Sequence, residues 1–450
     1  MNSALLNPVA LQLNNPTVHT LPNGLKIIAE RMPVEVMSLD IWARVGSAIE
    51  SDEINGMAHF LEHMVFKGTD KLRAGEFERR VEERGAVMNA ATSQDYTHFY
   101  ITCAPQDFAL LAPLQLDLVF NPSIPDTDFE AERQVVLEEI RRAEDSPQRR
   151  SYTHMVEAAF ERLPYRRPVL GPSSVVERLT PQQMRDFYYA WYRPENLTIV
   201  AVGNLPVEAM IETIVENIPQ VFHERTAAAI ATLPAMPESA MAGSDPPSSG
   251  TPEPAFGQVE RHEFTDPTLQ QARLMMTWRV PGLQHLDQTY ALDVLSSILS
   301  HGRTSRLVQD LRETRSLVTS ISAGNTDYWV QGLFTVSARL PEENLELVEA
   351  AILQHLRELQ TCLVKASEIQ RVRTQVANRF VFGNERPSDR MGLYGYYQTL
   401  IGDLEPAFNY PTIIRNVTAE DVQEAALRYL PTDAYSLVMI RPESAQTTVN

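Results

Sequence analysis

The stretch GMAHFLEHMVFKGT, Gly56 to Thr69, decides how this sequence is interpreted. The chain has only 10 histidines among its 450 residues, and two of them, His59 and His63, stand four residues apart here, with Glu62 directly before the second. Four residues are about one helical turn, so a helix places both imidazoles on one face with Glu62 beside them. The stretch therefore predicts a helix that carries part of a metal site.

The H-x-x-E-H pattern in this stretch points to zinc. Two neutral imidazoles can bind the ion, and Glu62 then stands where it can transfer a proton. A catalytic zinc needs a third protein ligand and one open position for water. The third ligand must come from elsewhere in the chain.

The segment Phe129 to Pro147, rich in glutamate, is the best place to look for that ligand. Glu132 and Glu139 are seven residues apart, so they share one face of a helix, and the valines at 135–136 indicate that this face is partly buried. A buried carboxylate is costly unless it is paired or coordinates a metal. Glu138 points about 100° away and is the weaker candidate.

Composition excludes several classes of protein. With 44% hydrophobic and 22% charged residues, and no apolar run of about 18 residues, the chain is expected to be soluble and globular without a membrane span. A net charge of -19 argues against a nucleic-acid partner and favours basic ligands. The two cysteines, Cys103 and Cys362, exclude a disulfide framework and are expected to be buried. The N-terminus lacks a signal-peptide pattern, so we expect a cytoplasmic protein with a short unstructured leader.

The chain divides into two similar halves. Residues 224–257 concentrate Pro, Ser, Gly and Ala and are predicted to be a linker between domains at 16–223 and 258–445. Shifts of about 235 to 238 residues superimpose the hydrophobic patterns of the halves, which predicts a tandem duplication. Each half begins with a strand pair, the first turning at Asn23-Gly24, and continues with a helix, further strands, long helices and a closing strand. We expect an α+β fold in which helices pack on a mainly antiparallel sheet.

The residues HFLEHMVFKGT resemble the inverted-motif zinc metallopeptidases, the family of pitrilysin, insulin-degrading enzyme and the mitochondrial processing peptidase. The resemblance covers about residues 16 to 445 and is closest to the short bacterial two-domain subunits related to the processing peptidase. It implies that the glutamate 76 positions after His63, which is Glu139, is the third zinc ligand. It also implies that Glu132, seven residues earlier, supports the site.

The resemblance carries over further residues. Asn89 and Ala90, in NAATSQDYTHFY, match the substrate-binding edge strand of the family, and an exposed strand edge can pair with an extended peptide. Arg390 and Tyr397 match an arginine and tyrosine pair that binds substrate and the developing oxyanion. The sequence leaves open that Arg390 forms a surface ion pair instead. It also leaves open that Tyr394 or Tyr396, rather than Tyr397, is the relevant tyrosine.

The second half is expected to have lost the metal ligands. A shift of about 235 places His59, Glu62 and His63 on Val294, Ser297 and Ile298. It places Glu139 near Gln375. These four residues of the second half cannot form a metal site. The family resemblance implies the same for the second domain of its two-domain subunits.

These features predict a zinc-dependent endopeptidase that hydrolyses unfolded or presequence-like peptides, with a preference for basic ones. The resemblance implies that 450 residues form half of a closed chamber, and hence a homodimer or a heterodimer with a related subunit. The alternative from another class is a non-catalytic structural subunit of a larger complex with the same fold. A peptidase for one specific precursor differs only in its substrate.

Overall fold

The N-terminal half is built on a six-stranded sheet. The computed structural model of the chain describes residues 15–223 and 250–443. In the first sheet the strand order is β1-β2-β6-β3-β5-β4, with β2 and β6 parallel and the other neighbours antiparallel. The strands are β1 Thr17–Thr20, β2 Lys26–Arg31, β3 Met37–Ala43, β4 Val87–Thr92, β5 Thr97–Cys103 and β6 Leu197–Gly203.

The C-terminal half repeats this arrangement with one strand fewer. Its order is β7-β11-β8-β10-β9, and only β7 and β11 are parallel. This order matches β2-β6-β3-β5-β4, so the α+β fold with two mainly antiparallel sheets is confirmed. The strands are β7 Val259–Asp266, β8 Ala272–Pro281, β9 Ser320–Thr326, β10 Gln331–Leu340 and β11 Tyr435–Pro442.

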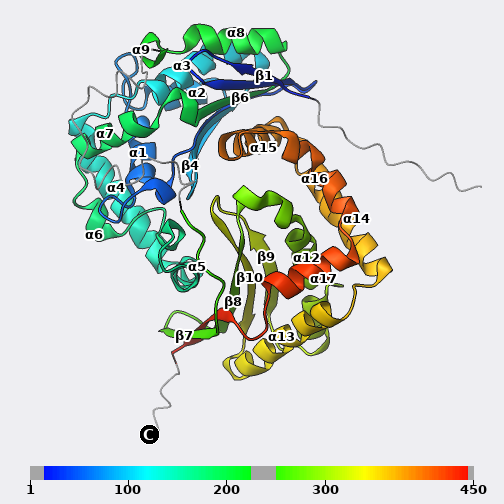
Figure 1. Cartoon of the computed structure of the whole chain (residues 1–450). Helices are drawn as coiled ribbons and strands as arrows, with labels where there is room; N and C mark the ends of the chain where they lie inside the picture. The colour runs from blue at the N-terminus through cyan, green and yellow to red at the C-terminus, as the bar shows by residue number, and fades with distance from the viewer. Residues whose placement is uncertain (1–14, 224–249, 444–450) are drawn as a thin grey trace, which may run out of the picture.

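Helices surround both sheets (Figure 1). In the first half they are α1 Met57–Val65, α2 Glu76–Glu82, α3 Phe108–Phe120, α4 Asp126–Asp145, α5 Pro147–Ala159, α6 Ser173–Val176, α7 Pro181–Trp191, α8 Val207–Asn217 and α9 Gln220–His223. In the second they are α12 Tyr290–Ser300, α13 Leu345–Thr361, α14 Ala366–Phe382, α15 Pro387–Leu400, α16 Glu405–Asn416 and α17 Ala419–Tyr429, with a π-helix, η7, at Val308–Thr314. Short 3₁₀ segments are η1 Ser47–Ile49, η2 Pro105–Asp107, η3 Pro164–Arg166, η4 Pro194–Asn196, η6 Leu283–Gln288 and η8 Glu342–Asn344.

Local signals recur at equivalent positions in the two halves. Thr180 and Thr418, 238 residues apart in the chain, each close a capping box at the start of α7 and α17. A capping box satisfies two of the amide groups that a helix start leaves without partners. The hairpin between β1 and β2 turns at Asn23-Gly24, where Gly24 has a φ of +90°, as the sequence predicts. The capping box is thus one local signal that the two halves share.

The two halves exchange one helix each across their interface. Helix α5 of the N-terminal half packs on β8 and β11, where Met155 and Val156 meet Met275 and Val438. Helix α15 of the C-terminal half packs in the same way on β3 and β6 of the first sheet. The opposite face of the first sheet holds the main N-terminal core with α1, α3 and α8. Each sheet is therefore buried on one face by its own helices and on the other by a helix of the other half.

The predicted linker falls partly outside the described residues. Its first part, 224–249, lies outside them, and the domain boundaries at 223 and 258 stay a proposal. The segment 250–257 packs against the protein, and the buried carboxylate of Glu253 accepts hydrogen bonds from the backbone N–H groups of Glu161, Arg162 and Leu163. This part of the segment is anchored to the N-terminal half.

Two further expectations can be compared with the structure. Within the described residues no helix combines the length and the apolar composition that crossing a membrane requires. Cys103 is buried, as expected, but Cys362 is exposed because it follows directly after the end of α13.

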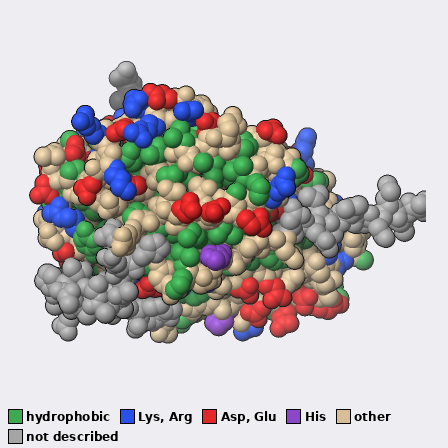
Figure 2. Space-filling model, turned by 90° about the horizontal axis from the view of Figure 1, so that it is seen from above, with side chains coloured by type: hydrophobic (Ala, Val, Ile, Leu, Met, Phe, Trp, Pro, Cys, Tyr) green, Lys and Arg blue, Asp and Glu red, His purple; other side chains and the backbone are tan. Residues whose placement is uncertain are grey.

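On the face seen from above, acidic and basic side chains are mixed over the upper part and acidic ones gather towards the lower right (Figure 2).

Candidate metal centre

Helix α1 presents the H-x-x-E-H residues, and its start is fixed by a buried carboxylate. Glu50 accepts hydrogen bonds from the N–H groups of Gly56 and Ala58 and from the side chain of Asn55, at 2.7 to 2.9 Å. Gly56 has a φ of +99°, and a Cβ there would lie 2.6 Å from a backbone oxygen, so only glycine fits this position. A carboxyl group at a helix N-terminus is favourable because its oxygens accept hydrogen bonds from the free N–H groups.

The structure brings His59, His63 and Glu139 together. His59 and His63 project from one face of α1, with ring centroids 4.8 Å apart. The Nε2 atoms of both rings lie 3.5 Å from Oε2 of Glu139, which extends from α4. Among the described residues this is the one group of three His, Cys, Asp or Glu side chains whose potential ligand atoms all lie within 4.8 Å of one another.

These distances fit a zinc ion. Zinc binds histidine nitrogen and carboxylate oxygen at about 2.0 to 2.1 Å in tetrahedral geometry, which places its ligand atoms roughly 3.4 Å apart. The separations from Glu139 to His59 and to His63 agree with that value. The donor set of two imidazoles and one carboxylate also leaves the fourth position open, as catalytic zinc sites do.

Glu132 supports His63 from behind, and a lysine supports Glu132. The Nδ1–H of His63 donates to Oε1 of Glu132 at 2.8 Å, and Nζ of Lys67 lies 2.5 Å from Oε2 of the same carboxylate. A proton held on Nδ1 leaves the lone pair of Nε2 free on the side of Glu139. Glu138, by contrast, forms ion pairs with arginines of its own helix, as expected for a carboxylate on another face.

The two imidazoles have opposite electrostatic environments. Burial and the nearby His63 lower the pKa of His59 to about 4, so its ring is neutral at neutral pH. Burial opposes protonation of His63 as well, but its hydrogen bonds to Glu132 and Glu139 raise its pKa to about 9. The hydrogen bond to His63 lowers the pKa of Glu139. A metal ion must therefore displace a proton from His63.

Glu62 lies next to the three ligand residues and contacts the edge strand. The hydroxyl of Thr92, at the end of β4, donates a hydrogen bond to its carboxylate. Burial raises the pKa of Glu62, while the hydrogen bond from Thr92 lowers it. A carboxylate with a raised pKa is suited to accept a proton and release it again near neutral pH.

Asn89 and Ala90 lie on β4, the last strand of the sheet. Among the described strands β4 pairs only with β5, so its other edge is free. The N–H of Ala90 donates to its neighbour Asn89 at 2.9 Å, and both residues lie within three positions of Thr92. The strand edge that can accept a peptide is therefore directly connected to Glu62.

Arg390 and Tyr397 are not part of this group within the chain. Both lie on α15, on the face of the first sheet opposite to α1. Arg390 is buried, forms an ion pair with Glu30 of β2 and donates to a backbone oxygen, and Tyr394 donates to the same glutamate at 2.7 Å. Arg390 is thus not the surface ion-pair residue that the sequence allowed, because its partner is buried.

Several residues of the site were missed by reasoning from the sequence. These are Glu50, Lys67 and Thr92, whose contacts are described above, and Glu30 beneath α15. Only Lys67 has a local signal, because it stands four residues after His63, just past the end of α1. The two valines between Glu132 and Glu139 were expected to mark a partly buried face, and only one of them does. Val136 is fully buried, but Val135 is 50% exposed because consecutive residues of a helix point about 100° apart.

The described residues of the C-terminal half contain no equivalent set of ligands. Val294 and Ile298 of α12 are fully buried in its hydrophobic core, and Ser297 is buried between them. Gln375 on α14 is exposed. Apolar side chains occupy the positions at which α1 has imidazoles, so α12 packs against its sheet as a core helix.

Two profiles of one peptidase family match the sequence along most of its length. The profile described as Insulinase (Peptidase family M16) matches residues 26–173. The profile described as Peptidase M16 inactive domain matches residues 178–376. The chain belongs to peptidase family M16. The second M16 profile begins before α7 and β6, which complete the first sheet, so its start does not coincide with the boundary between the two sheets.

Bacterial M16 relatives match over nearly the whole chain, and each is named an uncharacterized zinc protease. The protein from Rickettsia bellii is 27% identical over 426 residues, which are 94% of this chain and 97% of the relative. The protein from Streptomyces coelicolor is 29% identical over 409 residues, or 90% and 85%. YmxG of Bacillus subtilis is 25% identical over 427 residues, or 94% and 98%.

Solved structures share the fold. A protease from Helicobacter pylori has a TM-score of 0.84 at 24% identity, over 95% of this chain and 99% of that one. A chain of complex III2 from Candida albicans has a TM-score of 0.75 at 17% identity, over 94% and 95%. The same fold thus occurs in a protein described as a protease and in a chain of complex III2.

Proposed function

We propose that this M16 chain is a zinc-dependent endopeptidase that hydrolyses unfolded or presequence-like peptides. The observation that carries the proposal is the convergence of His59, His63 and Glu139, whose ligand atoms fit one tetrahedral ion. A zinc ion held by these three residues would act as a Lewis acid and make water a stronger nucleophile at neutral pH. The names of the bacterial relatives support the same metal and reaction.

The chain's own residues have distinct parts in this proposal. Glu62 takes a proton from the attacking water and returns it to the leaving amine. Glu132 holds His63 in the tautomer that leaves its Nε2 free, and Lys67 keeps Glu132 ionised by pairing with it. Thr92 fixes the direction of the Glu62 carboxylate.

Strand β4 is proposed to bind the substrate. An extended peptide would pair its main chain with the free edge at Asn89 and Ala90, two to three residues from Thr92. Main-chain pairing depends little on side chains, so the enzyme would accept many unfolded sequences. The net charge of -19 favours basic ones among them.

A dimer is proposed as the working form. Arg390 and Tyr397 lie on the far side of the sheet from the metal ligands of their own chain. Both are also buried within their own chain, so the dimer rests on the family resemblance, which implies half of a closed chamber; the partner is either a second copy or a related subunit. Size measurement of the purified chain, alone and mixed with a related subunit of the same organism, distinguishes these forms.

The decisive experiment combines metal content with turnover. Elemental analysis of the purified chain is expected to give about one zinc per chain, and an unfolded peptide should be cleaved. A chelator should abolish cleavage, and added zinc should restore it. A chain that holds no zinc and cleaves no peptide would instead be a structural subunit. This alternative is considered because the chain shares its fold with a chain of complex III2.

A further inference from the structure

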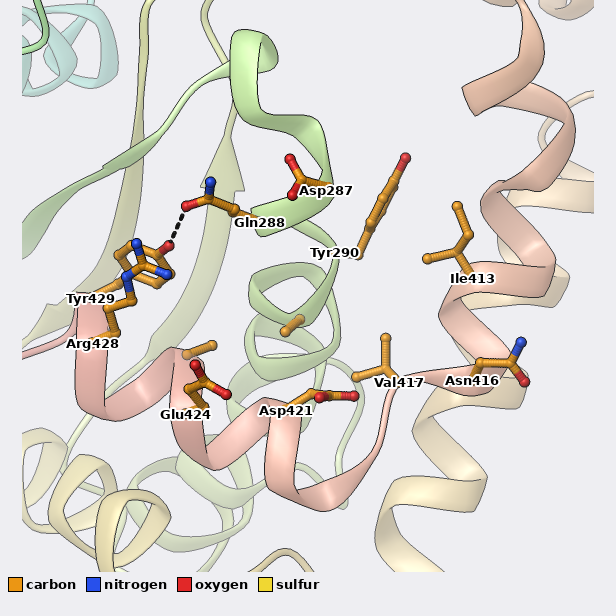
Figure 3. A pocket seen from close by; sticks show the side chains of 12 residues that line it. Asp287, Gln288, Tyr290, Ile413, Asn416, Val417, Asp421, Glu424, Arg428 and Tyr429 are labelled. Carbon is orange, nitrogen blue, oxygen red and sulfur yellow. Dashed lines mark hydrogen bonds between the residues drawn. The ribbon is translucent and has the colours of Figure 1, made fainter.

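A cavity of about 480 Å³ opens in the C-terminal half, in the domain without metal ligands. It lies between the start of α12, the end of α16 and helix α17 (Figure 3). Ile413, Val417 and Ala425 give it apolar walls, and Asp287 and Glu424 stand on opposite sides of it. A cavity of this size accommodates a side chain together with the adjoining peptide.

The charges around the cavity are unbalanced. Asp287 and Glu424 are exposed, and neither forms an ion pair with any described residue. Asp421 caps α17 by accepting from the N–H of Thr418 at 2.8 Å, and it forms no ion pair with any described residue. Arg428 stacks on a tyrosine ring at 5.1 Å from its centroid and does not bridge to Glu424. Three carboxylates therefore face one guanidinium.

A buried phenol with an unused hydroxyl forms part of the wall. Tyr290 is only 8% exposed, yet its hydroxyl makes no hydrogen bond with any described residue. Its ring stands between Asp287 and Ile413 (Figure 3), and packs edge-on against Tyr410 at 5.8 Å. The oxygen itself is accessible although the rest of the side chain is buried, so the hydroxyl is available to a ligand atom in the cavity.

Two more carboxylates lie behind Tyr290. Asp293 accepts hydrogen bonds from Tyr410 and Asn325, and the same amide donates to Asp327. Neither carboxylate has a cationic partner among the described residues. Burial, with the charges of Asp293, Asp287 and Asp327, raises the pKa of Tyr290 to about 12. Burial raises the pKa of Asp293 to about 6 and that of Asp327 to about 7, so a cation bound nearby would favour their ionised forms.

We propose that this cavity binds the basic side chain, lysine or arginine, of a peptide. Asp287 and Glu424 pair with the cation, the hydroxyl of Tyr290 accepts one of its N–H groups, and the alkyl stem lies along Ile413 and Val417. The peptide class rests on the proposed function, because a peptidase meets peptides as substrates. The contact lies in the opposite half from His59 and Glu139, so it would hold a part of the peptide remote from the bond that is cleaved.

The test measures binding and requires no turnover. The zinc-loaded full-length Glu62→Gln variant is titrated into a fluorescein-labelled heptapeptide with one arginine, and into its neutral citrulline counterpart. We expect the arginine peptide to bind about tenfold more tightly, since two carboxylates contribute to the contact. The preference should fall to about twofold or less in the same protein carrying Asp287→Asn and Glu424→Gln. Glu346→Gln, an exposed acid on α13 outside the cavity, should leave it unchanged.

Tyr290→Phe provides a second, independent reading. It keeps the ring and removes only the unused hydroxyl, so folding should be preserved while the arginine peptide binds about threefold more weakly. Equal binding of the two peptides to the parent, or an arginine preference that survives the double substitution, overturns the proposal. Absence of peptidase activity in the unsubstituted chain would contradict the proposed function but would not change this binding result.

Discussion

Thr92 donates a hydrogen bond to Glu62, and this contact joins the edge strand β4 to the metal-ligand helix α1. The strand proposed to hold the peptide therefore also holds the proposed general base. A peptide paired with β4 would have its main chain in a fixed position relative to the Glu62 carboxylate. Positioning of this kind is a major contribution to enzymatic rate.

Replacing Thr92 by valine should shift the acid limb of the pH profile. Burial raises the pKa of Glu62, and the hydroxyl of Thr92 counteracts the shift, so its removal raises the pKa further. The base is active when ionised, so kcat/KM should begin to fall at a higher pH than in the parent, because a hydrogen bond to a charged group contributes about 1.5–3 kcal/mol. Thr102→Val, on the next strand, should leave the profile unchanged. An unshifted profile in Thr92→Val contradicts this role.

Glu62→Gln should separate metal binding from turnover. Glutamine keeps the size of the side chain but cannot accept a proton, so we expect about one zinc per chain and a loss of at least about 100-fold in kcat. Elemental analysis and a peptide-cleavage assay on the same preparation measure both. Glu138→Gln, a nearby half-buried acid paired with arginines, is the matched control and should behave as the parent. Turnover retained in Glu62→Gln would remove this residue from the mechanism.

Zinc uptake should release a proton at pH 7. The hydrogen bonds to Glu132 and Glu139, acting against burial, raise the pKa of His63 to about 9, so the metal-free protein carries a proton that zinc must displace. Calorimetric titration in two buffers of different ionisation enthalpy should give about one proton per zinc, and the affinity should increase with pH up to about 9. In Glu132→Gln we expect less proton release and about 10- to 100-fold weaker binding. Equal heats in both buffers would show that His63 is neutral before zinc binds.

Glu50 should make stability depend on pH. Burial raises its pKa from 4.5 to about 7 in the folded chain. The folded state therefore holds a proton that the unfolded state has lost, and the corresponding stability is full below pH 4.5 and disappears as pH rises through 7. Between pH 4.5 and 8 the parent should lose about 3 kcal/mol relative to Glu50→Gln, measured by urea unfolding. Glu53→Gln, at an exposed position nearby, is the control and should show the same pH dependence as the parent. If the free energy of unfolding of the parent and of Glu50→Gln changed equally with pH, the raised pKa of Glu50 would be refuted.

Arg390→Ala should reduce stability more than a surface substitution does. It leaves Glu30 buried without its cation, which typically costs about 3–5 kcal/mol in the free energy of unfolding. A double change to Arg390→Met and Glu30→Leu should recover a large part of that loss, because no unpaired charge remains. Arg386→Ala, an exposed arginine at the start of the same helix, should change the free energy by about 0.5 kcal/mol or less. A loss of kcat in Arg390→Ala with unchanged unfolding would assign the residue to catalysis instead.

The sequence predicts those parts of the site that lie within one helix. Spacings of four and seven residues fix which side chains share a helix face, so the pairs His59 with His63 and Glu132 with Glu139 could be read from the letters. The sheet architecture followed in the same way from the repeated hydrophobic pattern. Glu138 could be set aside on the same geometric ground.

Contacts between distant segments could not be predicted. Glu30 and Arg390 are 360 residues apart, and no periodicity relates them. Thr92 reaches Glu62 only because the sheet places β4 next to α1. Cys362 is exposed because its helix ends one residue earlier, a boundary that amphipathic periodicity does not define sharply.

The exchange of α5 and α15 has a consequence for how this molecule could have arisen and can be divided. An isolated half would present to water the apolar sheet face that the other half's helix now covers, with side chains such as Met275 and Val438 in one half and Trp42 and Val200 in the other. Fragments cut at the junction should therefore aggregate when produced singly and become soluble when produced together. If the two halves arose by gene duplication, loss of either half would leave an apolar sheet face of the other exposed to water. The half without metal ligands is therefore needed for folding.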